Sequence, residues 1–468
     1  MNRRGPKTRG QGVDPALRHT IRNQHRSALA AAVAGPPQIH PVPPAAEANG
    51  GLAHTKHRLG GERPFFNDWV WPLVDHQNQK IYSYGGVRPL DESNSPTADF
   101  HRLDVRTMQW QNLTDELRFR PRNYIFDPFR KASLDRRRLP ALTESACTII
   151  TMDGGTFFLL FGGHDSDNPT ADLIAVDLED LIWWFVDIQG TPIRPRMSAS
   201  MVATGHQIFI FGGRDRFDDD APEIRTYSIA KYDPRTRWTW TVSDGPLPPD
   251  LPFLGYSIQA TTVHDGQKIL LTRGRIDDRP IDMSREATIF FHTQNHTFGN
   301  ARETLGDFPR GIAWYQLGSV VAGAQVPIVA DAQAPLTPRA RGRRPKKPLP
   351  PTLPVIPNIN VPAPIFPPSV VIVGWIKHSA GDDNLVPEVW QYLLPPTERI
   401  RCLNLRELIW DLELDIQAFV VVGNRLLLLG NEEEDGSAAA EDDQMLVDGA
   451  APKWDVAIEI STQYLTEK

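Results

Sequence analysis

The stretch that decides the fold is Gln207-Ile-Phe-Ile-Phe-Gly212-Gly213, a short apolar run that ends in a glycine pair. The same pattern occurs earlier as Thr156-Phe-Phe-Leu-Leu-Phe-Gly162-Gly163 and as Lys80-Ile-Tyr-Ser-Tyr-Gly85-Gly86. Short runs of aromatic and β-branched residues that are bounded by glycine are typical of β-strands leading into a turn. Three copies of one strand-and-turn pattern indicate an internal repeat.

Three weaker copies follow in the second half of the chain. They are Lys268-Ile-Leu-Leu-Thr-Arg-Gly274, Ser369-Val-Val-Ile-Val-Gly374-Trp375 and Arg425-Leu-Leu-Leu-Leu-Gly430-Asn431. The six copies are 77, 50, 62, 100 and 56 residues apart, and visible insertions account for the longer intervals. We therefore predict six repeat units; the alternative is a set of unrelated hairpins with chance glycine pairs.

Each unit contains more than the strand that ends in glycine. Another apolar segment precedes that strand, for example at 198–203 and 257–263, and in the first three units a third strand and then a tryptophan follow it. The predicted structural aromatic residues are Trp110, Trp183 (or Trp184) and Trp238 (or Trp240), with Phe298 in this place in the fourth unit. The predicted structural glycines are Gly85, Gly86, Gly162, Gly163, Gly212, Gly213, Gly274, Gly374 and Gly430. Four strands per unit is the content of one blade of a β-propeller.

These residue types suit crowded neighbouring sheets. Glycine permits a positive φ and a close backbone approach, and a large aromatic side chain buries about 150–250 Å² between two sheets. The pattern resembles the kelch repeat, whose period is about 50 residues. The resemblance implies an all-β, kelch-type β-propeller over residues 63–468, with six blades of four antiparallel strands and long loop insertions. Seven blades, or a first blade completed by residues 52–66, are the alternatives.

Composition limits the function classes. A net charge of −7 argues against nucleic-acid binding by the whole chain. The two cysteines, Cys147 and Cys402, are too few for a disulfide framework and suit a reducing compartment. No apolar stretch is long enough for a transmembrane helix, so we expect no contact with a membrane.

Residues 1–62 are arginine-rich at first and then rich in alanine and proline. This composition predicts a disordered basic tail, with a proline-rich linker over 35–51, and does not fit a secretory signal. A mitochondrial transit peptide is the alternative. We expect the protein in the cytoplasm, the nucleus or both.

The topology of a blade assigns its loops to two faces. Strands a to d of a blade, counted outwards from the centre, run antiparallel. The b–c loop after the glycines and the d–a loop between blades therefore leave one face, which we call the b–c/d–a face, and the a–b and c–d loops leave the other. The longest insertion, 324–368, falls between strands a and b of the fifth unit, and its many prolines predict an extended segment.

A run of cations lies inside this proline-rich insertion, namely Arg341, Arg343, Arg344, Lys346 and Lys347. Such a run is typical of a nuclear import signal or of a patch that binds polyanions, and a plain solubilising linker is the alternative. The run also resembles an AT-hook, a segment that lies in the DNA minor groove. Arg344 departs from that motif because it separates Arg343 from the following proline.

Two further insertions fall on the b–c/d–a face. The acidic insertion, 431–452, follows Gly430 and contains eight acidic residues without a cation, which predicts a disordered, solvated loop. The insertion over 114–140 is basic in its second half. One hypothesis is that the acidic loop occupies a cationic site on the same face and competes with an acidic partner.

Cations begin the successive b–c loops, and others occur in the d–a loops. The candidate partner-binding residues are Arg88, His164, Arg194, Arg196, Arg214, Arg275, Arg310 and Lys377. If the propeller closes, these residues approach a ring that favours an acidic peptide, because arginine forms charge-assisted, often bidentate contacts with carboxylates. The alternative is that nearby acids such as Asp165 and Asp215 form local salt bridges with them.

Catalytic motifs are not recognisable. The chain has no P-loop, GxSxG or HExxH motif, and its histidines lack the spacing of a metal site. We therefore predict a non-catalytic protein-interaction module that needs no cofactor or metal. Kelch-like propellers include galactose oxidase and nitrile-specifier enzymes, so a metal-dependent propeller enzyme is one alternative function. A nuclear protein that contacts polyanions through its basic insertion is the other.

Overall fold

The residues that the computed structural model describes form 27 strands and no helix. It describes residues 54–64, 72–86, 95–121, 137–165, 168–216, 224–232, 239–249, 258–263, 266–272, 288–300, 312–320, 369–377, 385–393, 399–403, 414–423, 425–432 and 455–461. The chain divides into two units, Met1–Glu47 and Ala48–Lys468, and every described residue belongs to the second. The predicted tail up to residue 53 and most of the three insertions lie outside the described residues.

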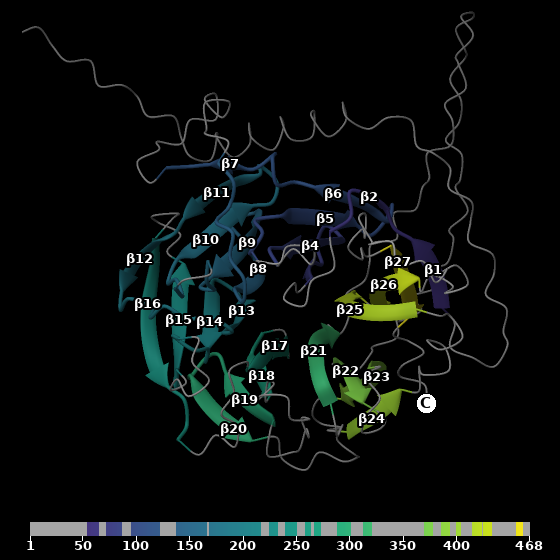
Figure 1. The fold of residues 1–468 in the computed structure, drawn as a ribbon. Coiled ribbons are helices and arrows are strands. Elements are labelled where there is room, and N and C mark those ends of the chain that lie inside the picture. Colours follow the sequence, from purple (N-terminus) through teal and green to yellow (C-terminus); the bar gives the residue numbers. More distant parts are fainter. Residues whose placement is uncertain are drawn as a thin grey trace, which may run out of the picture. The chain divides into compact units, whose positions relative to one another are not determined.

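The strands form six sheets, which are the blades of a β-propeller (Figure 1). Blade 1 contains β3 (Leu73–Asp75), β4 (Lys80–Tyr84), β5 (Phe100–Asp104) and β6 (Gln109–Asn112). Blade 2 contains β8 (Ala146–Met152), β9 (Gly155–Phe161), β10 (Leu173–Asp177) and β11 (Ile182–Phe185). Blade 3 contains β13 (Ser200–Thr204), β14 (Gln207–Phe211), β15 (Thr226–Tyr232) and β16 (Thr239–Pro246).

The second half of the chain forms the other three blades. Blade 4 contains β17 (Gln259–Val263), β18 (Lys268–Thr272), β19 (Thr288–His292) and β20 (Thr297–Asn300). Blade 5 contains β21 (Ile312–Val320), β22 (Ser369–Lys377), β23 (Leu385–Leu393) and β24 (Arg399–Leu403). Blade 6 contains β25 (Leu414–Val422), β26 (Arg425–Glu432), β27 (Val456–Ser461) and β1 (His54–Arg58). The predicted all-β propeller is confirmed.

The first strand of each blade is the innermost. Each of β3, β8, β13, β17, β21 and β25 contacts the inner strand of the next blade, and β25 contacts β3, so the inner strands form a closed ring. The outer strand of blade 6 comes from the other end of the chain, because β1 pairs antiparallel with β27. Residues 54–61 were predicted as part of the tail, but they belong to two sheets, so the boundary at residue 62 was placed too late.

Three blades carry a fifth strand that the sequence analysis missed. The strands β2 (Gly60–Gly61), β7 (Arg118–Phe119) and β12 (Asp187–Gly190) pair parallel with the fourth strands of blades 1, 2 and 3. In each case the chain leaves one blade and runs along the outer edge of the next before it enters the inner strand. Each of these three blades has the predicted four antiparallel strands, and the linker adds a fifth, parallel strand to it.

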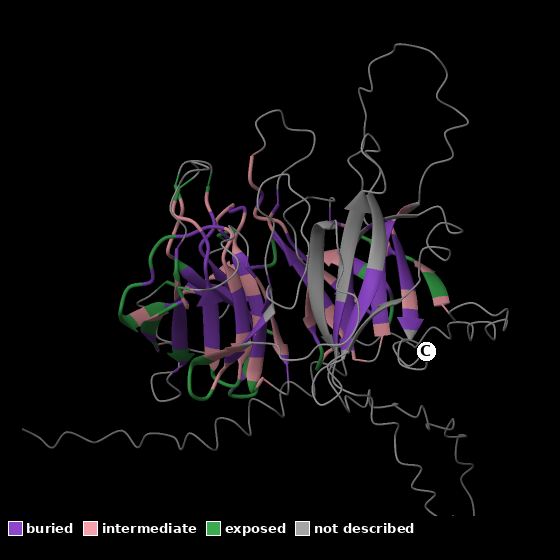
Figure 2. Ribbon diagram, turned by 90° about the horizontal axis from the view of Figure 1, so that it is seen from below, coloured by how far each residue is buried: buried purple, intermediate pink, exposed green. Residues whose placement is uncertain are grey.

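The apolar character of the second strands follows from the packing of the blades. Residues Phe157 to Phe161 of β9 are all buried, because one face of the blade packs on blade 1 and the other on blade 3. The strands of this part of the propeller are largely buried, and the loops at their ends are more exposed (Figure 2). A strand buried on both faces reads as a continuous apolar run rather than as an alternating one.

Candidate functional site

The loops of the b–c/d–a face meet between blades 2 and 3. The segment before β8 pairs with the loop after β9 through the bridge Thr143–His164, and Met197 and Arg214 form the same bridge one blade later. Each bridge has two backbone hydrogen bonds of 2.9–3.0 Å. The bridges therefore hold the start of each inner strand against the turn that follows the glycine pair.

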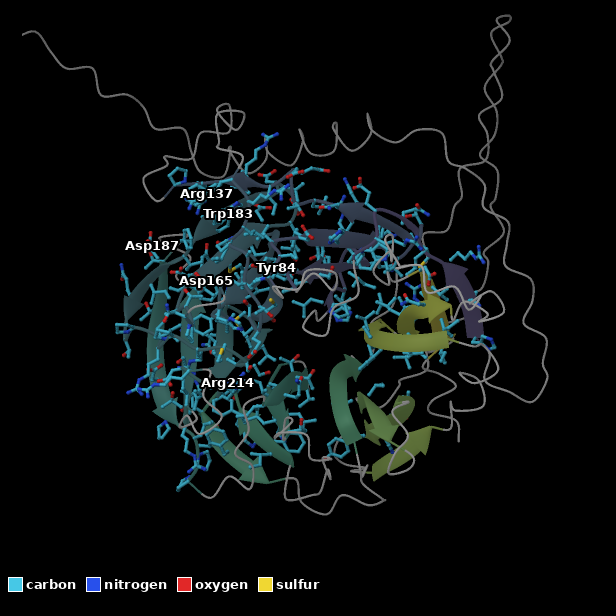
Figure 3. The ribbon with its side chains drawn as sticks, in the orientation of Figure 1. Tyr84, Arg137, Asp165, Trp183, Asp187 and Arg214 are labelled. Atoms are coloured by element: carbon cyan, nitrogen blue, oxygen red, sulfur yellow. The ribbon has the colours of Figure 1, made fainter. Side chains whose placement is uncertain are left out.

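Four side chains from these loops form a cluster, which we call the Glu144 cluster: Glu144, His164, Ser198 and Arg214. Glu144 Oε1 lies 3.7 Å from His164 Nε2 and 3.4 Å from Arg214 Nη2. The hydroxyl of Ser198 donates to Glu144 Oε2, and the backbone N–H of Ser198 donates to the Glu144 carbonyl oxygen at 2.9 Å. One carboxylate thus joins the loops of two blades, and Figure 3 labels Arg214 on its loop.

The Glu144 carboxylate is ionised in a partly desolvated site. The side chains of Glu144, His164 and Arg214 are 9%, 13% and 17% exposed. Burial by itself would raise the pKa of Glu144, but the contacts with His164 and Ser198 and the charge of Arg214 outweigh it and hold the pKa below its ordinary value. Glu144 therefore carries its negative charge at neutral pH, beside the positive charge of Arg214.

The backbone at this site is strained in two equivalent positions. Glu144 and Ser198 each stand two residues before an inner strand, and their φ angles are 54° and 53°. The left-handed region costs a residue with a side chain about 1–2 kcal/mol. The bridges and the Ser198–Glu144 hydrogen bonds impose this conformation, and they make the base of the two loops rigid.

The structure brings two of the eight predicted cations together. His164 and Arg214 share Glu144, whereas Arg194 is exposed in the d–a loop. Arg88, Arg275 and Arg310 lie outside the described residues, as does the side chain of Lys377 at the end of β22. The ring of cations thus stays a prediction, and its described part carries a carboxylate that the sequence analysis did not include.

Arg196 does not belong to the surface to which it was assigned. Its side chain is completely buried, and Nη1 donates to the carbonyl oxygen of Gly212 at 3.0 Å. Its own carbonyl oxygen accepts from the N–H of Gly163 at 2.9 Å. Arg196 therefore links the glycine pairs of blades 2 and 3 and is a structural residue rather than a partner-binding one.

Sequence reasoning missed Glu144, although a signal was present. Ala146 faces Phe161 and Ser200 faces Phe211 at the ends of equivalent strands, so Glu144 and Ser198 hold the same place in two repeats. Aligning the d–a loops of the repeats, and not only the glycine pairs, would have set a carboxylate beside the cations of the following turns. Arg216 and Arg225, both exposed at the ends of the blade 3 b–c loop, were missed as well.

The predicted structural glycines separate into two groups. Both glycines of the first three pairs have φ between 62° and 101° and directly follow β4, β9 and β14. A Cβ at Gly163 would lie 2.6 Å from the carbonyl oxygen of Thr143, so the bridge itself requires glycine there. Gly374 and Gly430 lie inside β22 and β26, because those strands continue beyond the glycine, and Gly274 is outside the described residues.

The predicted aromatic residues pack between blades. Trp110 lies in β6 among the residues shared by blades 6 and 1, and Trp183 in β11 among those shared by blades 1 and 2. Trp183 Nε1 also donates to the carbonyl oxygen of Arg137 at 2.7 Å, which anchors the returning end of the 114–140 insertion (Figure 3). Trp238 is outside the described residues, but its alternative, Trp240, is buried between blades 2 and 3.

The described part of the chain gives little support for a metal site, a reactive cysteine or a membrane-spanning helix. No group of three His, Cys, Asp or Glu side chains that could hold a metal ion occurs there. Cys147 is a free thiol, and burial raises its pKa, so it is not a poised nucleophile. Among the described residues, no helix is long and apolar enough to cross a membrane.

Known relatives match part of the chain. The chain is 26% identical over 212 residues to a mouse protein named "Rab9 effector protein with kelch motifs", and 24% and 25% identical to the rat and cattle proteins of that name. The fold and these relatives together support a kelch-repeat β-propeller. No model of a protein family matches the chain.

The match covers only part of each protein, which limits the conclusions about function that it supports. The matched region is 45% of this chain, which spans about half the length of the relatives (47–48%). The propeller fold and the kelch-motif relatives support, in general terms, the prediction of a protein-interaction module. The names of these relatives describe an effector, and neither the binding face nor the partner of this chain follows from them.

Proposed function

We propose that this kelch-repeat propeller is a non-catalytic interaction module that binds an acidic segment of a partner protein through the b–c/d–a face. The observation that carries the proposal is the group of exposed arginines on the loops of blade 3. Arg194, Arg216 and Arg225 are exposed. Within the described ranges, their guanidinium groups form no ion pair. Exposed guanidinium groups can form charge-assisted contacts with carboxylates.

The Glu144 cluster supports this proposal by making the loops rigid. Its hydrogen bonds and bridges join the d–a loop that carries Arg194 to the b–c loop that carries Arg216. A preorganised surface loses less conformational entropy when it binds. Because His164 and Arg214 already contact Glu144, we propose that the partner contacts the exposed arginines on the loops of blade 3 rather than a ring of cations around the whole face.

The relatives' name directs the choice of the first partner. Because these relatives are named as Rab9 effectors, we propose a small GTPase of the Rab9 kind as the protein to test. Binding would be measured by calorimetry with Rab9 loaded with a non-hydrolysable GTP analogue or with GDP. Binding that requires the GTP analogue is the expected result.

Charge-reversal variants test the face. The double variant Arg194→Glu and Arg216→Glu should weaken binding about tenfold or more and reduce its salt dependence, because rim and surface charges act on encounter and specificity. Arg106→Glu is the matched control, because Arg106 is exposed in the c–d turn of blade 1 on the opposite face. Equal affinities of the double variant and the wild type would exclude this face.

A further inference from the structure

Two polar side chains between blades 2 and 3 are completely buried and take no part in the Glu144 cluster: Arg196 and Ser228. Arg196 uses Nη1 for Gly212 and Nε for the carbonyl oxygen of Arg194, at 3.0 Å and 3.4 Å. In the described part of the chain, Arg196 Nη2 and Ser228 Oγ have no hydrogen-bond partner. A buried polar group without a partner destabilises the folded state, so a bound ligand that accepts from both atoms would stabilise it.

The strand register brings these two groups together. Ser228 in β15 is the cross-strand partner of Ile210 in β14 and of Asp244 in β16. Cross-strand partners point to the same side of a sheet. Because Ile210 belongs to the apolar cluster that blade 3 shares with blade 2, Ser228 also faces blade 2.

The guanidinium of Arg196 lies beside this row of residues, because Gly212 is two residues beyond Ile210. It bonds to Gly212 at the end of β14 and interacts electrostatically with Asp244 on β16. Ser228 stands on the strand between these two contacts. The orphan hydroxyl and the orphan Nη2 are thus both buried at the interface of blades 2 and 3.

The charge of Arg196 is poorly compensated at short range. Asp244 is exposed, and no carboxylate of the described residues forms an ion pair with Arg196. Burial lowers the pKa of Arg196 to about 10, so the side chain still carries its charge at neutral pH. A buried charge is tolerated when a counter-ion accompanies it.

We propose that Arg196 Nη2 and Ser228 Oγ bind a small monovalent anion of the halide class, such as chloride, between blades 2 and 3. Both atoms can donate a hydrogen bond, and a halide accepts from several directions. The ligand must be small because both side chains are completely buried. A water molecule would satisfy the two atoms but would leave the arginine charge uncompensated, and it is the alternative outcome of the test.

Thermal unfolding in two salts tests the site. In sodium chloride, Tm should rise with concentration and saturate about 1–2 °C above its value in sodium gluconate of equal ionic strength, because a ligand of the folded state stabilises it. Ser228→Ala should abolish at least half of this chloride-dependent rise. The same variant should unfold at or above the wild-type Tm in gluconate, because it removes a hydroxyl that has no partner.

A control and a second measurement keep the result specific. Ser243→Ala, an exposed position one residue before Asp244, should respond to chloride as the wild type does. Line broadening of the ³⁵Cl resonance by the wild-type protein should decrease in Ser228→Ala. Equal Tm values of the wild type in chloride and gluconate would favour water and overturn the proposal, as would an undiminished chloride effect in Ser228→Ala. Neither result would bear on partner binding, which involves other residues.

Discussion

The change Glu144→Gln tests the contact that joins blades 2 and 3. Glutamine has nearly the same size as glutamate, and its amide oxygen can still accept from Ser198. The change removes the negative charge that faces Arg214 and His164. Its effect on the free energy of unfolding therefore reports the ion pair rather than the packing.

The size of the effect follows from burial and distance. Removing one partner of a buried ion pair costs about 3–5 kcal/mol, and an exposed pair contributes about 0–1 kcal/mol. Glu144 and Arg214 lie 3.4 Å apart and are 9% and 17% exposed, so they fall between these cases. We expect Glu144→Gln to lower the free energy of unfolding by about 2 kcal/mol.

The chain offers a matched comparison at its other end. Glu459 in β27 also contacts a histidine and an arginine, with 3.1 Å to His57 and 3.5 Å to Arg425. These three side chains are more exposed, at 24%, 28% and 22%. Glu459→Gln should therefore cost about 0.5–1 kcal/mol.

Equilibrium unfolding in urea, followed by tryptophan fluorescence, measures both variants, with equal m values required for the comparison. Because the contacts hold the pKa of Glu144 below its ordinary value in the folded state, the stability they add is present above the unfolded-state pKa of about 4.3. That stability is lost as pH falls through the lower folded-state pKa. The gap between wild type and Glu144→Gln should be full at pH 7 and should narrow below about pH 4.3. Equal losses for Glu144→Gln and Glu459→Gln at pH 7, or a gap that persists in acid, would refute the reasoning.

Two other changes test the fold itself. Gly163→Ala should lower the free energy of unfolding by about 2–4 kcal/mol, because φ is 84° there and the new Cβ would collide with the carbonyl oxygen of Thr143. Gly205→Ala is the comparison. Its φ is 56°, but the new Cβ would have no atom within 4 Å, so the change should cost about 1 kcal/mol. Similar losses for both alanine variants in urea titrations would contradict the close-approach argument. Removing residues 1–53 should leave Tm unchanged. Removing residues 1–61 also removes β1 and β2 and should lower Tm by about 5 °C or more. If scanning calorimetry finds the same Tm for both truncated proteins, β1 does not stabilise the closed propeller.

The repeat predicted the parts of the fold that depend on neighbours in the chain. A strand that ends in a glycine pair is a local feature, and the second strands of blades 1, 2 and 3 end where the sequence placed them. The predicted strand ends were less accurate where the local pattern was weaker. Gly374 and Gly430 lie inside longer strands, and β2 and β7 are two residues long, too short to show a period.

The repeat pattern could not predict features that join distant segments of the chain. His54 pairs with Ile460, and no local periodicity relates residues that lie so far apart in the chain. The Glu144 cluster likewise draws on loops of two blades, and its geometry depends on how those blades stack. The sequence showed the cations of the cluster, but the carboxylate between them became visible only with the register of the strands.

Arg194 and Arg196 show the division between sequence and tertiary structure most directly. They are two residues apart in one loop and have the same chemistry, so the sequence determined that this face is rich in arginine and assigned both residues to it. Only the tertiary structure decided that Arg194 meets solvent and that Arg196 is buried against Gly212. The physical reason is that burial depends on contacts with other strands: Arg196 is held by hydrogen bonds to Gly163 and Gly212 of two blades, and Arg194 is exposed.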